Sequence, residues 1–161
     1  MSKLNVTLSE IEKARHVLSQ LFDATPLLAN RWLSEKTGCQ VFLKLENMHP
    51  IGSFKIRGAT YKISKLTAAQ RRKGVVAASA GNHAQGVAWG CATYKTKATI
   101  FMPVNAPLMK VQNTEALGAK IILEGENYDE AYAIAKKFAA KSGQVFIHPY
   151  DDEDVIAGQG T

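Results

Sequence analysis

The chain of 161 residues has few cysteines and lacks a long apolar segment. Its two cysteines, Cys39 and Cys91, belong to no CxxC pair, which argues against a disulfide framework and a zinc site and fits a reducing compartment. No apolar run is long enough to cross a bilayer, and the polar start, residues 1–18, lacks the apolar core of a signal peptide. The histidines without metal-like spacing are His16, His49 and His148. We therefore expect a cytoplasmic protein with no membrane partner and no bound metal.

Basic residues are also not gathered in one place, although the formal net charge is +6. Arg71, Arg72 and Lys73 form the only tight basic run, at the end of a polar stretch that is typical of a solvated loop or helix end. No nucleic-acid-binding motif with interleaved aromatic residues accompanies this run. A nucleic-acid partner is therefore not expected.

From residue 75 onward, short apolar runs alternate with amphipathic stretches. The apolar runs, predicted as buried strands, are 75–80, 98–103, 119–124 and 144–149. The stretches between them, predicted as helices, are 83–95, 106–117 and 127–142. Strands joined by helical crossovers are parallel, and continuous apolar runs are typical of a sheet with helices on both faces. The sequence therefore predicts an α/β fold with an open parallel sheet.

The first part of the chain has weaker signals. Helices are expected over about 9–21 and 27–36, with a further strand at 40–46. Trp32 is expected to pack against the core or a neighbouring helix. At the other end, the acidic residues 151–154 predict a turn or the first turn of a helix.

Lys55 lies in the segment NMHPIGSFKIRGA, residues 47–59, where a turn meets Ser53, a residue suited to cap a helix N-terminus. The helical spacing of the following apolar residues places Lys55 in the first turn of a helix. Free amide N–H groups and the positive end of the helix dipole disfavour an ammonium there, as does burial. Lys55 is therefore a candidate for a neutral amine that reacts with an aldehyde. The alternative is an ordinary solvated lysine, one of 20 Lys and Arg residues.

A second candidate site is SAGNHAQG, residues 79–86, where a predicted strand ends and a helix begins. At such a junction several free N–H groups point the same way, so open α/β sheets bind anions there. Ser79, Asn82 and His83 would add side-chain donors. The alternative is that Asn82 only caps the helix and that His83 is a polar residue of its first turn.

The same junction lacks the signatures of nucleotide-binding and hydrolytic sites. Counted from Gly81 to Gly86, Val87 and Ala88 occupy the positions where a Walker loop requires Lys and Ser or Thr, and no GxGxxG is present. Ser79 does not lie in a GxSxG elbow. A nucleotide P-loop is excluded, and a Ser/His hydrolase is not supported.

The segments GSFKIRGA and SAGNHAQG, followed by VIAGQGT, resemble in order and spacing the threonine dehydratase (threonine ammonia-lyase) group of fold-type-II pyridoxal-phosphate enzymes. The resemblance covers about residues 25–161. It implies that the cofactor is pyridoxal 5'-phosphate and that Lys55 is the Schiff-base lysine. It also implies that Phe54 packs beside the cofactor and that Asn82 hydrogen-bonds its phenolic oxygen.

The implied reaction converts L-threonine, or L-serine, to a 2-oxo acid and ammonia. By the resemblance, Lys55 removes the Cα proton of this small amino-acid substrate, and Ser79, Asn82 and His83 bind its carboxylate. A serine racemase-like enzyme is the alternative within the group. Racemases of the group typically have a serine, acting as an acid on the opposite face, where this sequence has Ala80. Ala80 cannot supply a proton, which favours elimination over racemisation.

The resemblance also implies a domain organisation. Residues 1–47 would be the N-terminal segment of a large domain, 48–148 the small α/β domain with the Schiff-base lysine, and 149–161 the start of the rest of the large domain. The glycine-rich loop for the cofactor phosphate is expected beyond residue 161, in a longer enzyme that forms homo-oligomers. The alternative is a truncated, non-catalytic binding module of this fold.

Overall fold

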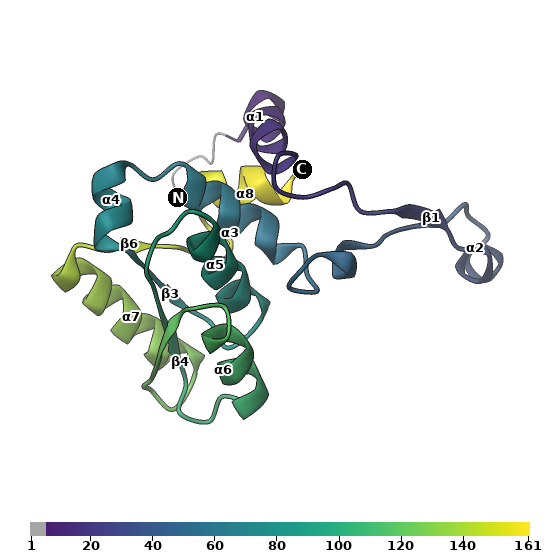
Figure 1. The fold of residues 1–161 in the computed structure, drawn as a ribbon. Helices are drawn as coiled ribbons and strands as arrows, with labels where there is room; N and C mark the ends of the chain where they lie inside the picture. The colour runs from purple at the N-terminus through teal and green to yellow at the C-terminus, as the bar shows by residue number, and fades with distance from the viewer. Residues whose placement is uncertain (1–5) are drawn as a thin grey trace.

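A four-stranded parallel sheet forms the centre of the computed structural model, which describes residues 6–161 (Figure 1). Its strand order is β5-β4-β3-β6, and all three pairings are parallel. The strands are β3 (Val75–Ala78), β4 (Ala98–Met102), β5 (Lys120–Leu123) and β6 (Val145–Phe146). Each strand lies within its predicted apolar run and is shorter than that run. The predicted α/β fold with a parallel sheet is confirmed.

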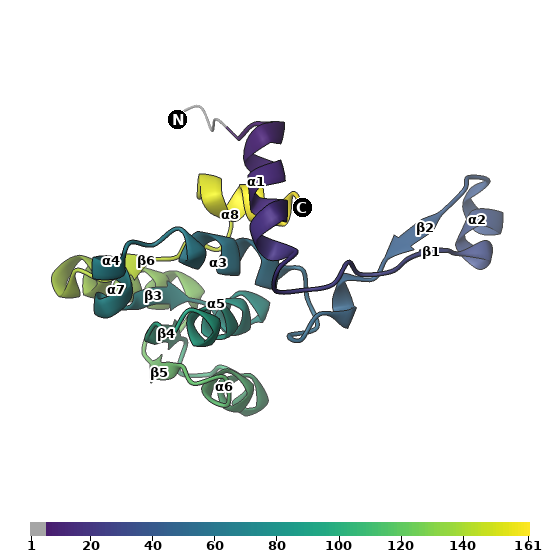
Figure 2. The same ribbon diagram turned by 45° about the horizontal axis from the view of Figure 1, so that its top comes forward.

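Helices cover both faces of this sheet. The helices on one face are α3 (Lys55–Ser64), α5 (Asn82–Thr93) and α6 (Leu108–Glu115), and α7 (Tyr128–Ser142) covers the other (Figures 1 and 2). Strand alternation divides the core accordingly: Ile100 belongs to the α3 and α5 side, whereas Phe101 belongs to the α7 side. Because both faces are covered, every residue of β3 and β4 is buried, which explains their continuous apolar sequences.

The N-terminal part of the chain forms an arm that projects from the sheet domain (Figures 1 and 2). It consists of β1 (Leu27–Ala29), α2 (Arg31–Thr37) and β2 (Phe42–Lys44). The strand predicted at 40–46 is therefore confirmed, but it pairs antiparallel with β1 in a separate two-stranded sheet. The helix predicted over 27–36 is wrong at its start, because residues 27–29 form this pairing and Asn30 then caps α2.

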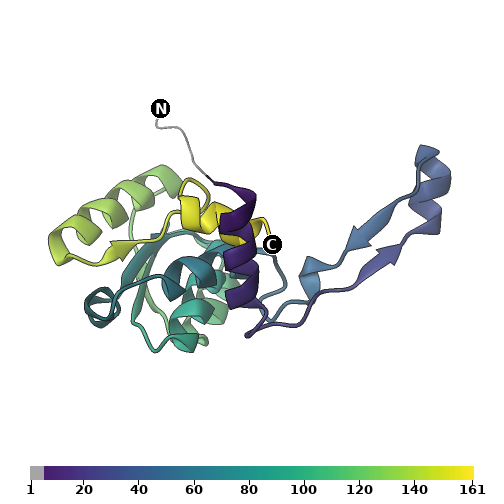
Figure 3. The ribbon, with the colours of Figure 1, turned by 90° about the horizontal axis from the view of Figure 1, so that it is seen from above.

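Apolar side chains of the arm face solvent in the described part of the chain. Leu27 is 62% exposed, Phe42 is 54% exposed and Trp32 is 64% exposed. The expectation that Trp32 packs against the core or a neighbouring helix is wrong, because the arm stands away from the sheet domain (Figure 3). Such a row of exposed large apolar residues is typical of a surface that another part of an assembly covers.

Helix α3 packs between α5 and a pair of helices from the two ends of the chain, α1 (Leu8–Leu18) and α8 (Glu153–Gln159) (Figure 3). Asp152 caps α8, so the acidic segment 151–154 is the predicted helix start. Lys62 of α3 forms ion pairs with Asp152 at 2.8 Å and with Asp154 at 3.0 Å. These contacts join the C-terminal helix to the helix that begins at Lys55.

Two short helices complete the described structure, the 3-10 turn η1 (Glu46–Met48) and α4 (Ala68–Lys73). The basic residues Arg71, Arg72 and Lys73 lie in the last turn of α4, as expected for a solvated helix end. Among the described helices, none is long and apolar enough to span a membrane.

Candidate functional site

Lys55 is the first residue of helix α3, so its predicted place in a helix first turn is confirmed. The N-cap position is Phe54 rather than the predicted Ser53, and Phe54 makes no side-chain capping bond. The Ser53 hydroxyl still accepts the backbone N–H of Lys55, at 3.3 Å. The helix therefore starts one residue later than a simple Ser53 cap predicts, with Ser53 satisfying one of the free amide groups.

The amine of Lys55 is half-buried and hydrogen-bonded to the main chain. Its Nζ donates to the carbonyl oxygen of Pro149 at 2.8 Å and lies 5.5 Å from the centre of the Phe54 ring. Burial lowers the pKa of Lys55 below the usual value for lysine. The amine consequently loses its proton more easily than a surface lysine does, which is the condition for attack on an aldehyde.

Helices α3 and α5 approach each other closely at Gly86, which brings the two sequence motifs side by side. A Cβ atom on Gly86 would lie 3.0 Å from the main-chain oxygen of Lys55 and 3.4 Å from the Cβ atom of Ala59. A larger residue would therefore push the N-terminus of α5 away from Lys55. This close approach places the free amide groups at the start of α5 beside the helix that carries Lys55.

The junction between β3 and α5 is open to solvent. The hydroxyl of Ser79 accepts the N–H of Gly81 at 3.1 Å, and the Asn82 side chain is exposed. Nothing lies within 4 Å of the place that a Cβ atom of Gly81 would take. Within the described residues, the backbone N–H groups of Asn82 and His83 have no acceptor. These features suit the predicted anion-binding junction.

His83 is held differently from Ser79 and Asn82. Its side chain is only 4% exposed, and Nε2 donates to the carbonyl oxygen of Ile147 at 3.1 Å, while Nδ1 has no hydrogen-bond partner in the described structure. Burial lowers the pKa of His83 to about 4, and the nearby charge of Lys55 acts in the same direction. Since its side-chain N–H is already bound to Ile147, the free donor that His83 presents at the junction is its backbone N–H.

A pH-dependent loss of stability is expected from His83. The folded-state pKa of His83, about 4, lies below the unfolded value of 6.5. The contribution of the neutral His83 side chain to the unfolding free energy is therefore complete above pH 6.5 and is lost as the pH falls toward 4. Between these values the unfolding free energy should decrease by up to about 1.4 kcal/mol per pH unit. Urea unfolding at pH 5 and pH 7 measures this difference. In His83→Gln, whose amide can donate to Ile147 but does not titrate, the difference should shrink; an unchanged difference would assign it to other groups.

A network around Glu46 fixes the N-terminal half of α3. Arg57 donates to Glu46 through Nε at 2.6 Å and Nη2 at 3.0 Å, and Thr25 and His49 also contact this carboxylate. Burial opposes ionisation of Glu46, but the bonds from Arg57 and Thr25 and the charge of Arg57 outweigh it and lower the pKa of Glu46 to about 2. The network thus ties the helix that begins at Lys55 to the base of the arm.

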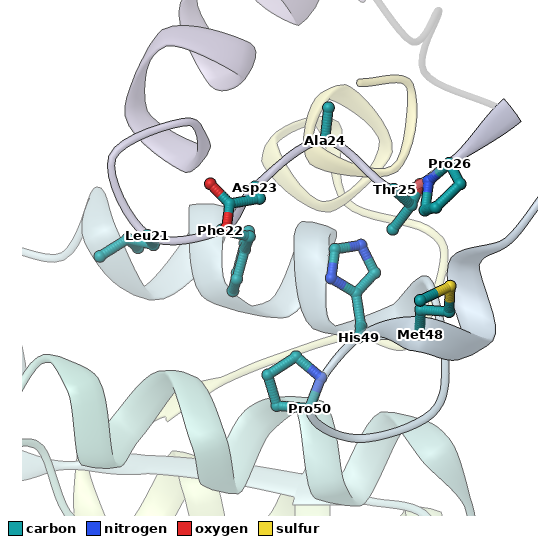
Figure 4. A pocket seen from close by; sticks show the side chains of 9 residues that line it. All are labelled: Leu21, Phe22, Asp23, Ala24, Thr25, Pro26, Met48, His49 and Pro50. Atoms are coloured by element: carbon teal, nitrogen blue, oxygen red, sulfur yellow. The ribbon is translucent and has the colours of Figure 1, made fainter.

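A pocket of about 320 Å³ lies at the base of the arm (Figure 4). Its lining residues are Leu21, Phe22, Asp23, Ala24, Thr25, Pro26, Met48, His49 and Pro50. None of the predicted site residues lines it, and the His49 ring, which packs edge-on against Phe22 at 5.3 Å, closes one wall. The pocket therefore borders the turn that leads to Lys55 and is separate from the junction at Gly81.

Sequence reasoning missed the groups that hold the two candidate side chains in place. These groups are the main-chain oxygens of Ile147 and Pro149, which accept bonds from His83 and Lys55. Every residue has a main-chain carbonyl oxygen whatever its side chain, so no residue type marks these two positions. The only sequence signal was indirect, the Pro149 that ends the apolar run of β6.

A half-buried lysine with a lowered pKa beside an open strand–helix junction of a parallel sheet suits an α/β domain that binds a carbonyl cofactor. The sequence profile of the family PALP, pyridoxal-phosphate dependent enzyme, matches residues 18–161. The chain belongs to this family, whose cofactor is pyridoxal phosphate. The resemblance to pyridoxal-phosphate enzymes is thereby confirmed.

Within this family, the chain is similar to curated proteins named for threonine cleavage. The chain is 51% identical to the L-threonine ammonia-lyase of Thermotoga maritima over 156 residues, which are 97% of this chain and 39% of that protein. It is 48% identical to the catabolic L-threonine dehydratase TdcB of Staphylococcus aureus over 157 residues, which are 97% of this chain and 45% of that protein. The chain thus spans less than half the length of these relatives.

Solved structures share the fold. The processed form of threonine deaminase isoform 2 from Solanum lycopersicum aligns with a TM-score of 0.85 at 35% identity, covering 94% of this chain and 43% of that one. Maize serine racemase aligns with a TM-score of 0.90 at 32% identity, covering 95% of this chain and 46% of that one. Both groups weighed from the sequence, dehydratases and serine racemases, therefore have this arrangement of helices and strands.

Proposed function

We propose that the protein is a pyridoxal-phosphate-dependent dehydratase that converts L-threonine, and L-serine as a further substrate, to a 2-oxo acid and ammonia. The observation that carries this proposal is the half-buried amine of Lys55 in the first turn of α3, beside the free amide groups of Asn82 and His83. The two curated relatives named for threonine cleavage support this substrate. Ala80, at the place of the racemase serine, favours elimination over racemisation.

The residues near Lys55 fit the cofactor of the family. Lys55 would attach it through Nζ, the Phe54 ring, 46% exposed, would pack against its ring, and the exposed amide of Asn82 would bind its phenolic oxygen. Pyridoxal phosphate, when bound, supplies an electron sink for the negative charge that develops at the substrate Cα. The loop for its phosphate is proposed to lie in the part of the relatives that these 161 residues do not span.

The remaining groups of the site would hold the substrate and move its proton. The Ser79 hydroxyl, the Asn82 side chain and the backbone N–H of His83 offer hydrogen bonds to a carboxylate at the N-terminus of α5. The lowered pKa of Lys55 suits this amine to accept the Cα proton. The β-hydroxyl group would then leave as water together with the proton taken from Cα, and hydrolysis of the released enamine gives the 2-oxo acid and ammonia.

We also propose a division of the chain into parts of two domains. Residues 48–148 would form the small domain, and residues 1–47 and 149–161 would belong to the large domain. The arm supports this division, because its exposed apolar residues lie apart from the parallel sheet. The same exposed surface is consistent with assembly of the complete enzyme as a homo-oligomer. A cytoplasmic location agrees with the free cysteines Cys39 and Cys91.

Product analysis tests the proposed reaction. The protein, supplied with pyridoxal phosphate and L-threonine, is expected to form 2-oxobutanoate and ammonia in equal amounts. With L-serine it should form pyruvate, and chiral chromatography should detect little D-serine. Formation of D-serine with little pyruvate would favour the racemase alternative, and no product with any of these substrates would favour the non-catalytic module.

A further inference from the structure

One short segment, residues 147–151, contacts side chains from both candidate motifs. The carbonyl oxygen of Ile147 accepts Nε2–H of His83 at 3.1 Å, and the carbonyl oxygen of Pro149 accepts Nζ of Lys55 at 2.8 Å. Ile147 and Pro149 are buried, so bulk water cannot take the place of either carbonyl as the hydrogen-bond acceptor without a local rearrangement. The conformation of this segment therefore sets where both side chains lie.

The residue between the two carbonyls, His148, fixes the turn through its own ring. Its Nδ1 accepts the backbone N–H of Asp151 at 2.7 Å and that of Tyr150 at 3.3 Å. Both partners are N–H donors, so Nδ1 carries no proton and the imidazole is neutral. The ring thereby closes a turn of the kind that Asn and Asp side chains form with backbone groups two and three residues ahead.

Aromatic neighbours hold the His148 ring in this orientation. Its ring centre lies 4.7 Å from that of Tyr150, 5.8 Å from that of Tyr132 in α7 and 6.3 Å from that of Phe146, all with edge-on geometry. Removing the imidazole could thus act in two ways, through the lost acceptor or through the lost ring packing. The two can be separated, because phenylalanine keeps the ring and asparagine keeps an acceptor.

Charged groups around the ring act in both directions. Burial lowers the pKa of His148 and the charge of Lys136 on α7 lowers it further, whereas Asp151 and Asp152 raise it. The net direction is downward, in agreement with an unprotonated Nδ1 that accepts two N–H groups.

We propose that His148 is a positioning residue for Lys55: its Nδ1 fixes the turn after β6, and the Pro149 carbonyl of that turn holds the Lys55 amine at the N-terminus of α3. The role of His148 in turnover rests on the proposed function, whereas its effect on the Lys55 amine is a property of the chain itself. His148 has no contact with substrate or cofactor in this role; it acts through Pro149.

Competitive acylation measures the state of the amine without the cofactor. The protein is treated with a trace of acetic anhydride at a series of pH values, and mass spectrometry gives the extent of acetylation of each lysine. In the wild-type protein Lys55 should reach half of its full reactivity at a lower pH than is usual for a lysine side chain, because burial lowers the pKa of Lys55.

The two variants should then differ in whether the titration of Lys55 changes. In His148→Phe the turn loses its acceptor and the Pro149 carbonyl no longer holds the amine, so the titration of Lys55 should shift by at least about 0.5 pH unit from that of wild type. In His148→Asn the side-chain oxygen can accept the same N–H groups, and the titration should stay within about 0.2 pH unit of wild type. A wild-type titration in both variants, or an equal shift in both, would overturn the proposal.

The same samples distinguish this proposal from the proposed function. Thermal unfolding of both variants checks that the fold is retained. The change in unfolding free energy between pH 5 and pH 7 that depends on His83 provides an internal reference. Product assays with L-threonine follow separately. A protein that forms no 2-oxobutanoate but shows the expected acylation pattern would refute the proposed function and leave the placement of Lys55 by His148 supported.

Discussion

Replacing Lys55 by alanine is expected to lower the formation of 2-oxobutanoate from L-threonine by at least about 10²- to 10⁴-fold. The variant would lose the amine that lies 2.8 Å from the Pro149 carbonyl, and with it both the attachment point for the cofactor and the base for the Cα proton. Initial rates with saturating pyridoxal phosphate measure the effect. The visible absorption that appears when wild-type protein binds the cofactor should be absent from the variant.

Lys65→Ala is the matched control for this experiment. Lys65 caps the C-terminal end of the same helix and is exposed, so its loss changes charge without touching the site. Its rate should stay within about twofold of wild type, since a surface substitution shifts energies by about 0.5 kcal/mol or less. Equal activity of Lys55→Ala and Lys65→Ala would contradict the assignment of Lys55.

Gly158→Ala is expected to destabilise the fold by about 1–3 kcal/mol through overpacking of α8 against α3. A Cβ atom on Gly158 would lie 2.7 Å from the Cα atom of Gly58, 2.9 Å from the main-chain oxygen of Arg57 and 3.0 Å from the Cβ atom of Tyr61. These are backbone or first side-chain atoms, so a rotamer change cannot relieve the contact and the helices must separate. Urea unfolding at neutral pH measures the loss of unfolding free energy.

Gly160→Ala tests whether the effect comes from packing rather than from glycine itself. Gly160 closes the same helix with φ −73°, and its Cβ atom would meet only side-chain atoms of Ile11, Cδ1 at 3.0 Å, Cγ1 at 3.1 Å and Cγ2 at 3.4 Å. Its unfolding free energy should stay within about 0.5 kcal/mol of wild type. If Gly158→Ala were as stable as Gly160→Ala, α3 and α8 would not pack as closely as the structure has them.

The parallel sheet could be predicted from the sequence because its strands are buried on both faces. Val75 and Val76 are fully buried, and such continuous apolar runs separated by amphipathic helices have few other solutions. The arm could not be predicted equally well. Leu27 and Leu28 form strand β1 only because they pair with Lys44 and Leu43, which lie 17 and 15 residues later in the chain. The local sequence beginning at Leu27 also suits a helix.

The candidate site also has one part that could be predicted from the sequence and one part that could not. Lys55 and Asn82 could be located from the sequence, because turn residues and helix spacing place both at helix N-termini. The burial of His83 against Ile147 could not, since it depends on the distant strand β6 lying beside β3. Helix periodicity defines which residues begin a helix, whereas main-chain acceptors are supplied by tertiary structure.

The most direct test of the account is the site at which pyridoxal phosphate attaches. The protein is incubated with pyridoxal phosphate, reduced with borohydride and digested, and the pyridoxyl group is located by mass spectrometry. The account predicts label on Lys55 in preference to every other lysine, with the preference lost in Lys55→Ala. Label scattered over exposed lysines such as Lys65, with none enriched at Lys55, would contradict it.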